Sequence, residues 1–293
     1  MTVTTEVKQR IVTALLISRK NFHGSDAKFA VSLGINGAQY SRIKNGDNVH
    51  VLSDANWMSL ARRLNVNLTN EKQWNTAKTP VFEFITTQLE ICQKNGASSM
   101  LCDLSDIGKT HTAVHYAASH KNAVYVDCSQ VKSKQRLIRF IAKEFGVNSN
   151  GRYHDVYEDL VFYLKTLPDP IIILDEYGDV DYEAFLESKA LWNAAAGNCA
   201  FYVMGADGLQ EKMRRGIEKK KVGYVELFSR FSKKYGKVVP PGEEEARKML
   251  TANASMIIRA NTTSNIGVVL KGTMGEDGRP SLRRIQHELT KVI

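Results

Sequence analysis

A short apolar run, a polar loop that ends in Gly-Lys-Thr and a helix-like segment follow one another at residues 98–113, SSMLCDLSDIGKTHTA. This order is typical of a phosphate-binding loop, in which backbone N–H groups at a helix N-terminus hold the oxygens of a triphosphate. We expect Lys109 to supply the mobile cation and the hydroxyl of Thr110 to be a ligand of Mg²⁺. The residues expected to surround the phosphates are Asp106, Ile107, Gly108, Lys109, Thr110 and His111.

The loop departs from the usual pattern at two positions. Asp103 stands where the pattern G-x-x-x-x-G-K-[ST] has its first glycine, and Asp106 stands where many such loops have another. Two carboxylates beside a triphosphate repel it unless they point outward. The sequence therefore predicts a nucleotide site and leaves its affinity open.

A second motif lies at residues 171–176, IIILDE. Four consecutive apolar residues fit a fully buried parallel strand, and ligands of open α/β sheets bind at the carboxyl ends of such strands. We expect Asp175 to order the Mg²⁺ shell and Glu176 to polarise the attacking water, the two roles of a Walker B motif. A buried strand followed by exposed acids is common by itself, but both motifs in one chain favour a site for ATP and Mg²⁺.

The composition agrees with a globular protein that binds a polyanion. The chain has 293 residues, 43% of them hydrophobic, which is enough for one large domain or two smaller ones. The net charge of +9 favours nucleic acid as the first partner to consider, although a generic basic surface also fits it.

Two other patterns are missing from the sequence. It has no run of 18 apolar residues and no apolar N-terminal signal stretch, so we expect no membrane partner. The four cysteines form no CxxC pair, which favours reduced thiols over a zinc site. We therefore expect a cytoplasmic protein.

Residues 25–45, SDAKFAVSLGINGAQYSRIKN, have the spacing of two short helices around a tight turn. Ser25 is the expected N-cap and Gly34 the turn, and the second helix begins at Asn36 or Gly37. The pattern is typical of a Cro-like helix-turn-helix module, although a small helical bundle with a solvated polar face fits it too. The polar residues of the second helix that we expect to reach DNA are Gln39, Arg42 and Lys44.

Two further basic clusters are candidates for DNA contact. The first lies at the start of a helix predicted after a strand at residues 123–127, and consists of Lys132, Lys134 and Arg136. The second ends the basic stretch EKMRRGIEKKK and consists of Lys219, Lys220 and Lys221. A plain solvated face explains either cluster as well, so the sequence does not decide which of them touches DNA.

These segments predict three parts of the chain. Residues 1–66 form the helix-turn-helix domain, residues 67–80 a polar linker, and residues 81–293 an α/β domain with a parallel sheet flanked by helices. Helices are expected at residues 81–95 and 243–259, and a fourth strand at residues 200–204.

With these pieces in order, the chain resembles the MuB family, the AAA+ target-selection ATPases of phage Mu that are related to IstB and TnsC of other transposons. The resemblance covers nearly the whole chain. It is carried by CDLSDIGKT, IIILDEYGDV, FYVMGADGL, ELFSRF and PSLRRIQHEL, with the Cro-like module ahead of them. It implies the fold of an AAA+ P-loop NTPase with a short C-terminal helical lid.

The resemblance also implies roles for two arginines. Arg230 in LFSRF matches the arginine that is offered to the ATP of a neighbouring subunit, and Arg283 matches the sensor-2 residue that reads the γ-phosphate from the lid. Ala206 stands where a polar sensor-1 residue is usual. The sequence ends soon after Arg284, so we expect a shortened helical region at this end.

By this resemblance, the protein hydrolyses ATP slowly and forms a helical filament or ring of identical subunits on double-stranded DNA. It has little sequence preference, and it selects target DNA for a transposase that it activates. DNA or the transposase stimulates hydrolysis, in a prokaryotic, phage or mobile-element setting. Two alternatives stay open: a nucleotide-switched helix-turn-helix transcription regulator with a degenerate phosphate loop, and an ATPase that resembles a helicase loader. A single protected operator would favour the first, and capture of a replicative helicase the second.

Overall fold

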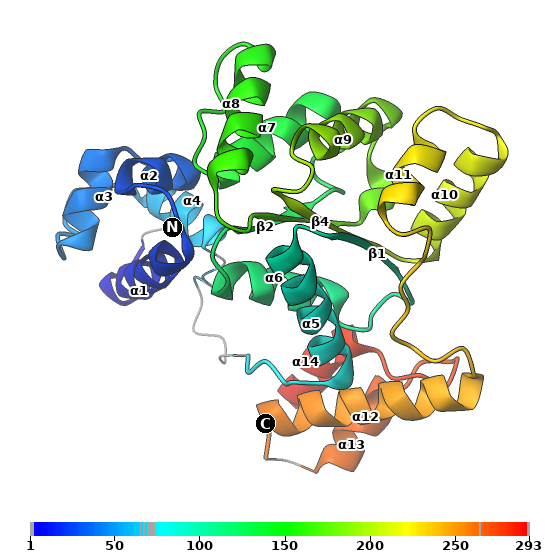
Figure 1. Cartoon of the computed structure of the whole chain (residues 1–293). Helices are drawn as coiled ribbons and strands as arrows, with labels where there is room; N and C mark the ends of the chain where they lie inside the picture. The colour runs from blue at the N-terminus through cyan, green and yellow to red at the C-terminus, as the bar shows by residue number, and fades with distance from the viewer. Residues whose placement is uncertain (1–2, 65, 67, 69–73, 264, 292–293) are drawn as a thin grey trace.

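The computed structural model describes residues 3–64, 66, 68, 74–263 and 265–291. In this part of the chain, a parallel sheet lies between two layers of helices, preceded by an N-terminal helical module and followed by a C-terminal group of helices that we call the lid (Figure 1). The strands are β1 (Ser98–Cys102), β2 (Ala123–Asp127), β3 (Ile171–Asp175) and β4 (Ala200–Gly205). The N-terminal helices are α1 (Thr5–Asn21), α2 (Asp26–Leu33), α3 (Gly37–Lys44) and α4 (Asp54–Arg63).

The remaining helices surround the sheet or form the lid. Those around the sheet are α5 (Pro80–Asn95), α6 (Lys109–Ser119), α7 (Lys134–Glu144), α8 (Tyr153–Thr166), α9 (Tyr182–Ala194), α10 (Asp207–Glu218) and α11 (Tyr224–Arg230), with a 3-10 turn η1 (Tyr177–Asp179) after β3. The lid contains α12 (Glu243–Asn261), α13 (Ile266–Thr273) and α14 (Leu282–Lys291).

The strand order is β1-β4-β3-β2, and every pair is parallel. Both β3 and β4 are buried along their whole length, which explains the continuous apolar runs in their sequences. Because β4 lies between β1 and β3, the loop after β1 and the acids after β3 face each other across the end of β4. The α/β architecture with a parallel sheet, expected from the sequence, is confirmed.

Alternate residues of the strands enter two hydrophobic clusters, one on each face of the sheet. On one face, Val126, Leu174 and Val203 pack against helices α7 to α11. On the other face, Ile173 and Tyr202 pack against α5, α6 and the first half of α12. Each fully buried side chain of this size contributes about 1.5–3 kcal/mol, so the strand alternation holds the sheet between its two helix layers.

Residues 236–239 extend the edge of the sheet beside β1. The N–H of Gly236 donates to the carbonyl of Met100 at 2.8 Å, and the N–H of Cys102 donates to the carbonyl of Gly236 at 3.1 Å. The sequence did not predict this segment as a strand, since Gly236 and Lys237 interrupt any apolar alternation.

Helices α1 to α4 have a hydrophobic cluster of their own, in which Tyr40, Ile43 and Trp57 are fully buried. Ser25 and Asn36 cap α2 and α3 with their side chains, and Gly34 turns the chain with φ at +70°. Phe29, Ala30, Leu33 and Ile35 of the helix-turn-helix segment are buried as well. Helix α1 was not predicted from the sequence, although it contributes Ile11 and Leu15 to this cluster.

The N-terminal module rests against helices of the sheet layers rather than standing apart from them. The side-chain amide of Asn21 donates to the carbonyl of Ala118 at the end of α6, at 2.6 Å. The ammonium of Lys28 lies 3.6 Å above the ring of Tyr163 on α8. The linker predicted at residues 67–80 lies partly outside the described residues. Among those described, none of the helices combines the length and apolar character needed to cross a bilayer.

Candidate functional site

The two sequence motifs meet through a direct hydrogen bond. Thr110, in the first turn of α6, donates its hydroxyl to Oδ2 of Asp175 at 2.6 Å. Asp175 ends β3 with 1% of its surface exposed, and its Oδ1 accepts the N–H of Glu176 at 3.0 Å. A hydroxyl and a carboxylate at this distance are the kind of oxygen ligands that Mg²⁺ prefers.

Lys109 is buried at the end of the phosphate loop, which we define as residues 103–110. Its ammonium donates to the loop carbonyls of Asp103, at 3.0 Å, and Leu104. Burial lowers the pKa of Lys109, and the negative charge of Asp103 partly offsets that effect. The cation thus sits inside the loop, where an incoming phosphate would find it.

Backbone donors are available at the same place. The first helical bond at this end of α6 runs from the N–H of Thr112 to the carbonyl of Gly108, at 3.0 Å. The N–H groups just before Thr112 have no carbonyl one turn earlier in the helix, so they can bind an anion. Gly108 has φ at +99° and Asp106 has φ at +59°, and left-handed residues of this kind curve a loop into an anion-binding concavity.

Asp103 does not face the phosphate side of the loop. Its carboxylate is buried, and Oδ2 accepts the N–H groups of Val238 and Val239 at 2.6 and 2.9 Å. Its Oδ1 accepts the N–H of Leu104 at 2.7 Å. The acid in the first glycine position therefore holds the edge segment 236–239 against the loop.

Asp106 points toward the lid. Its Oδ2 accepts the hydroxyl of Ser281 at 2.7 Å, and its Oδ1 accepts the N–H of Arg283 at 3.2 Å. Both acids of the loop therefore point away from the phosphate side. In this orientation their charges do not prevent a triphosphate from binding in the loop. The same contacts place Arg283 next to the phosphate loop, as expected for a residue that acts on it from the lid.

Glu176 follows Asp175 in a left-handed conformation, with φ at +49°. Such a conformation costs about 1–3 kcal/mol in a residue with a side chain and is often found at functional sites. Burial and the neighbouring charge of Asp175 raise the pKa of Glu176, and Lys109 acts in the opposite direction. Its position and its raised pKa suit a general base.

Two residues near the site were not predicted from the sequence. Tyr125 on β2 donates its hydroxyl to Oδ2 of Asp175 at 3.2 Å, so Asp175 has two hydroxyl partners. The hydroxyl oxygen of Thr76 lies 3.1 Å from Nε2 of His111. This hydrogen bond brings the segment ahead of α5 against the start of α6. Neither residue lies in a recognisable motif, so no sequence signal pointed to them.

Arg230 lies at the end of α11 and contacts α9. Its guanidinium lies 4.7 Å from the ring of Trp192, and its Nε donates to Oδ1 of Asn193 at 3.0 Å. The hydrogen-bond and ring partners of Arg230 therefore lie on α9 and α11 and not in the phosphate loop.

The two basic clusters predicted separately meet at residues 178–182. From the first cluster, Lys132 pairs with Asp179 at 3.1 Å. On α10, which precedes the second cluster, Lys212 donates to the carbonyls of Gly178 and Val180 at 2.7 and 2.6 Å. Lys221 lies 3.9 Å above the ring of Tyr182. We call the cations of the two clusters, together with Lys212 and Arg215 on α10, the basic face; it comprises Lys132, Lys134, Arg136, Lys212, Arg215, Lys219, Lys220 and Lys221.

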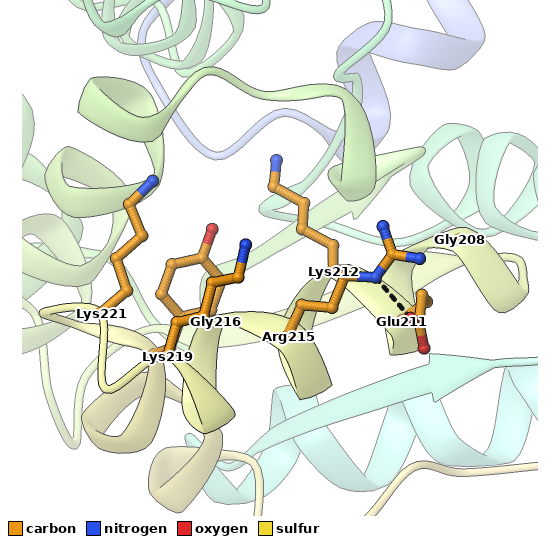
Figure 2. Close-up of a pocket in the computed structure, with 8 residues that line it drawn as sticks. Gly208, Glu211, Lys212, Arg215, Gly216, Lys219 and Lys221 are labelled. Carbon is orange, nitrogen blue, oxygen red and sulfur yellow. Dashed lines mark hydrogen bonds and ion pairs between the residues drawn. The ribbon is translucent and has the colours of Figure 1, made fainter.

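A pocket of about 450 Å³ opens on the basic face beside α10. Lys212, Lys219 and Lys221 line it and extend toward the same side in Figure 2. Some of the cations on this face are engaged within the chain, since Arg215 pairs with Glu211 at 2.5 Å. Lys134 similarly pairs with Glu187 at 3.3 Å.

The three candidate DNA contacts of α3 are held by neighbours in their own module. Gln39 completes a capping box with Asn36. Arg42 donates from Nε to Asp47 at 2.8 Å, and Lys44 to Asp26 at 2.9 Å. These two ion pairs are surface-exposed and therefore weak, so the cations can exchange partners.

The site residues fit a nucleotide with Mg²⁺. The loop offers a buried cation and free backbone donors, and Thr110 and Asp175 offer oxygen ligands. Among the described residues, no cluster of three or more His, Cys, Asp or Glu side chains could hold a metal. Mg²⁺ is usually bound through one or two protein oxygens together with phosphates and water, and Thr110 and Asp175 could supply the protein oxygens.

Comparison with known proteins agrees with this geometry. Residues 92–213 match the model of a family described as an AAA domain, which indicates a nucleotide-hydrolysing enzyme of the ATPase type. The chain is 26% identical over 228 residues to the Mu-like prophage FluMu DNA transposition protein B of Haemophilus influenzae. That alignment covers 74% of this chain and 78% of the relative. Both findings support the resemblance to MuB-family AAA+ ATPases.

Proposed function

We propose that this chain, an AAA-type ATPase similar to a prophage transposition protein, assembles on double-stranded DNA when it binds ATP and presents that DNA to a transposase. The hydrogen bond between Thr110 and Asp175 carries the nucleotide part of the proposal, because it joins the two motifs into one Mg²⁺ site. The basic face carries the DNA part. The AAA domain and the prophage relative support both.

In the proposed reaction, Lys109 leaves the loop carbonyls and binds phosphate oxygens, which the free N–H groups at the start of α6 also hold. Bound Mg²⁺ supplies positive charge that offsets the charge on the phosphates. Thr110 and Asp175 would hold that metal, and Glu176 would take the proton of the attacking water. The strained backbone of Glu176 keeps its carboxylate at the end of β3.

We further propose that Arg230 completes the site of a neighbouring subunit. Its partners on α9, Trp192 and Asn193, keep the guanidinium on the outer surface of its own chain. An arginine supplied by another subunit stabilises charge that develops during phosphate transfer. Hydrolysis would then depend on assembly, and a subunit alone would turn over slowly.

The basic face is the proposed DNA-binding surface. Lysine and arginine side chains that contact phosphates bind DNA without reading its sequence, with steep salt dependence. On α3, Gln39 caps its own helix, and Arg42 and Lys44 are paired with Asp47 and Asp26. We therefore assign Gln39, Arg42 and Lys44 a secondary role in DNA contact.

ATP hydrolysis measured with and without DNA tests the proposal most simply. We expect slow hydrolysis by the protein alone and faster hydrolysis when long duplex DNA of any sequence is added, because DNA brings subunits together. Equal rates in both conditions would count against the proposal. Stimulation by one short palindromic sequence only would favour a nucleotide-switched transcription regulator, and capture of a replicative helicase would favour a helicase loader.

A further inference from the structure

Asp106 occupies a backbone conformation that its side chain disfavours. Its φ of +59° lies in the left-handed region, where glycine is the usual residue. Glycine would also remove a negative charge from the phosphate loop. An aspartate here therefore needs a compensating interaction, and the structure contains one.

The carboxylate of Asp106 caps helix α14 from a distant part of the chain. It accepts the hydroxyl of Ser281, which precedes α14, and the N–H of Arg283 in its first turn. The first N–H groups of a helix lack partners within it, and a carboxylate placed there also interacts favourably with the helix dipole. One loop residue thus fixes the start of a helix 175 positions further along the chain.

The same contact seats α14 directly over the loop. A Cβ atom added to Gly108 would lie only 3.8 Å from the side chain of Leu282. The guanidinium of Arg283 forms only a long ion pair with Asp106, because its Nε lies 3.9 Å from Oδ1 and 83% of the side chain is exposed. The backbone of Arg283 is therefore anchored while its charged end stays exposed to solvent.

We propose that Asp106 is a positioning residue that fastens α14 to the phosphate loop and so holds Arg283 beside the bound nucleotide. This inference rests on the proposed function for the role of Arg283. It gives the aspartate a purpose in a loop that ordinarily has glycine. The carboxylate of Asp106 faces Ser281 and the start of α14. Its negative charge therefore stabilises the lid and does not repel the phosphates.

The fastening itself can be tested on the nucleotide-free protein by hydrogen exchange of peptides from residues 275–291. We expect Asp106→Ala to speed exchange in these peptides by about two- to thirty-fold, the range produced by loss of a helix N-cap. Ser281→Ala should give part of the effect, and Asp106→Asn, which keeps an acceptor oxygen, should restore most of the protection. Peptides from α9 serve as the internal control and should not change.

The Asp106→Gly variant separates this proposal from the simpler view that the loop is a degenerate one. Glycine relieves the backbone strain and restores the usual loop pattern, yet it removes the cap. We expect faster lid exchange in Asp106→Gly as well as in Asp106→Ala. Unchanged lid exchange in both variants would overturn the proposal, whatever DNA and ATP assays show.

A double-mutant cycle tests the consequence for the nucleotide, with equilibrium binding of fluorescent ATP and ADP analogues as the readout. We expect Arg283→Ala to lower the preference for ATP over ADP by about tenfold or more, the scale of a hydrogen bond to a charged group. Asp106→Ala should lower it too, but should add nothing in the Arg283→Ala background. Fully additive effects would mean that Asp106 acts on the phosphates directly and would overturn its role as a positioning residue.

Discussion

The hydroxyl of Thr110 lies 2.6 Å from Oδ2 of Asp175, although the two residues come from elements on either side of β4. The contact requires the correct order of strands and the correct register between them. Thr110 follows β1 and Asp175 ends β3, so the two side chains meet only when both strands pair with β4 in a register that aligns their carboxyl ends. This relationship is the physical basis for assigning a nucleotide and Mg²⁺ to the chain.

The carboxylate of Asp103 predicts a stability cost for the usual glycine. Asp103→Gly leaves the N–H groups of Val238 and Val239 without their acceptor, which costs about 1–3 kcal/mol for the buried donor of Val239 and less for the half-buried donor of Val238. Chemical denaturation should therefore show a lower free energy of unfolding. Asp103→Asn is the matched control, since it keeps one acceptor and should lose less. A variant with glycine that is as stable as the natural chain would contradict the assigned contacts.

The position of Glu176 predicts a separation of binding from hydrolysis. Glu176→Gln removes the base but leaves Lys109 and the loop donors, so we expect ATP binding near normal and hydrolysis reduced by about 10²–10⁴-fold. Binding of a fluorescent ATP analogue and phosphate release measure the two quantities. Glu183→Gln, on the exposed surface of α9, should alter neither. Loss of both properties together would argue against a general-base role.

The raised pKa of Glu176 predicts how hydrolysis depends on pH. Burial and Asp175 favour the protonated carboxyl, and only the ionised form can accept a proton from water. Hydrolysis should therefore fall as the pH drops through this raised pKa, at a higher pH than for an ordinary glutamate. The pH profile of kcat measures this, and a rate that holds constant down to the usual glutamate range would contradict it.

The basic face predicts that two clusters far apart in sequence act together. Arg136→Ala and Lys219→Ala should each reduce the slope of log affinity against log salt by about one. Lys248→Ala is the control, because Lys248 pairs with Glu244 on the lid at 2.7 Å. DNA binding over a series of salt concentrations measures the slopes. If the slope changed for one cluster and not for the other, the two would not form a single DNA-binding surface.

The location of Arg230 predicts complementation between two inactive variants. Arg230→Ala should reduce hydrolysis in the assembled state by about 10³-fold or more, the lower end of the arginine-finger range. Glu176→Gln is inactive for a different reason but keeps Arg230. Mixing the two variants should restore hydrolysis at interfaces where the intact Glu176 of an Arg230→Ala subunit meets the intact Arg230 of a Glu176→Gln subunit. A mixture no more active than its components would place Arg230 outside the neighbour's site.

The sequence predicted the elements that local pattern determines. The continuous apolar run of β3 predicted the buried parallel strand, and the Gly-Lys-Thr loop predicted a phosphate site, because both patterns lie within a few consecutive residues. The helix caps at Ser25 and Asn36 and the turn at Gly34 were likewise predicted from the local sequence. Helix α1 and helix α8 were not predicted, although their buried residues recur at helical spacing, as Ile11 and Leu15 do in α1 and Leu160 and Leu164 do in α8.

Contacts over long distances in the chain were not predictable in the same way. The partners of Asp103 and Asp106 lie 135 and 175 residues away, so both acids looked like defects of the loop. The two basic clusters looked independent in the sequence, whereas in the structure Lys132 contacts Asp179 and Lys221 contacts Tyr182. Tyr125 carried no motif at all, and only the strand order brings its hydroxyl to Asp175.

The proposed function requires that ATP bound through Lys109 drives assembly of this chain on DNA. Electron microscopy of the protein with long duplex DNA, with and without ATP, tests it most directly, using Lys121→Ala, an exposed position beyond α6, as the control for Lys109→Ala. We predict regular assemblies on DNA with ATP for the natural chain and for Lys121→Ala, and none without ATP or with Lys109→Ala. Assemblies that form equally well without nucleotide, or that survive Lys109→Ala, would contradict the account.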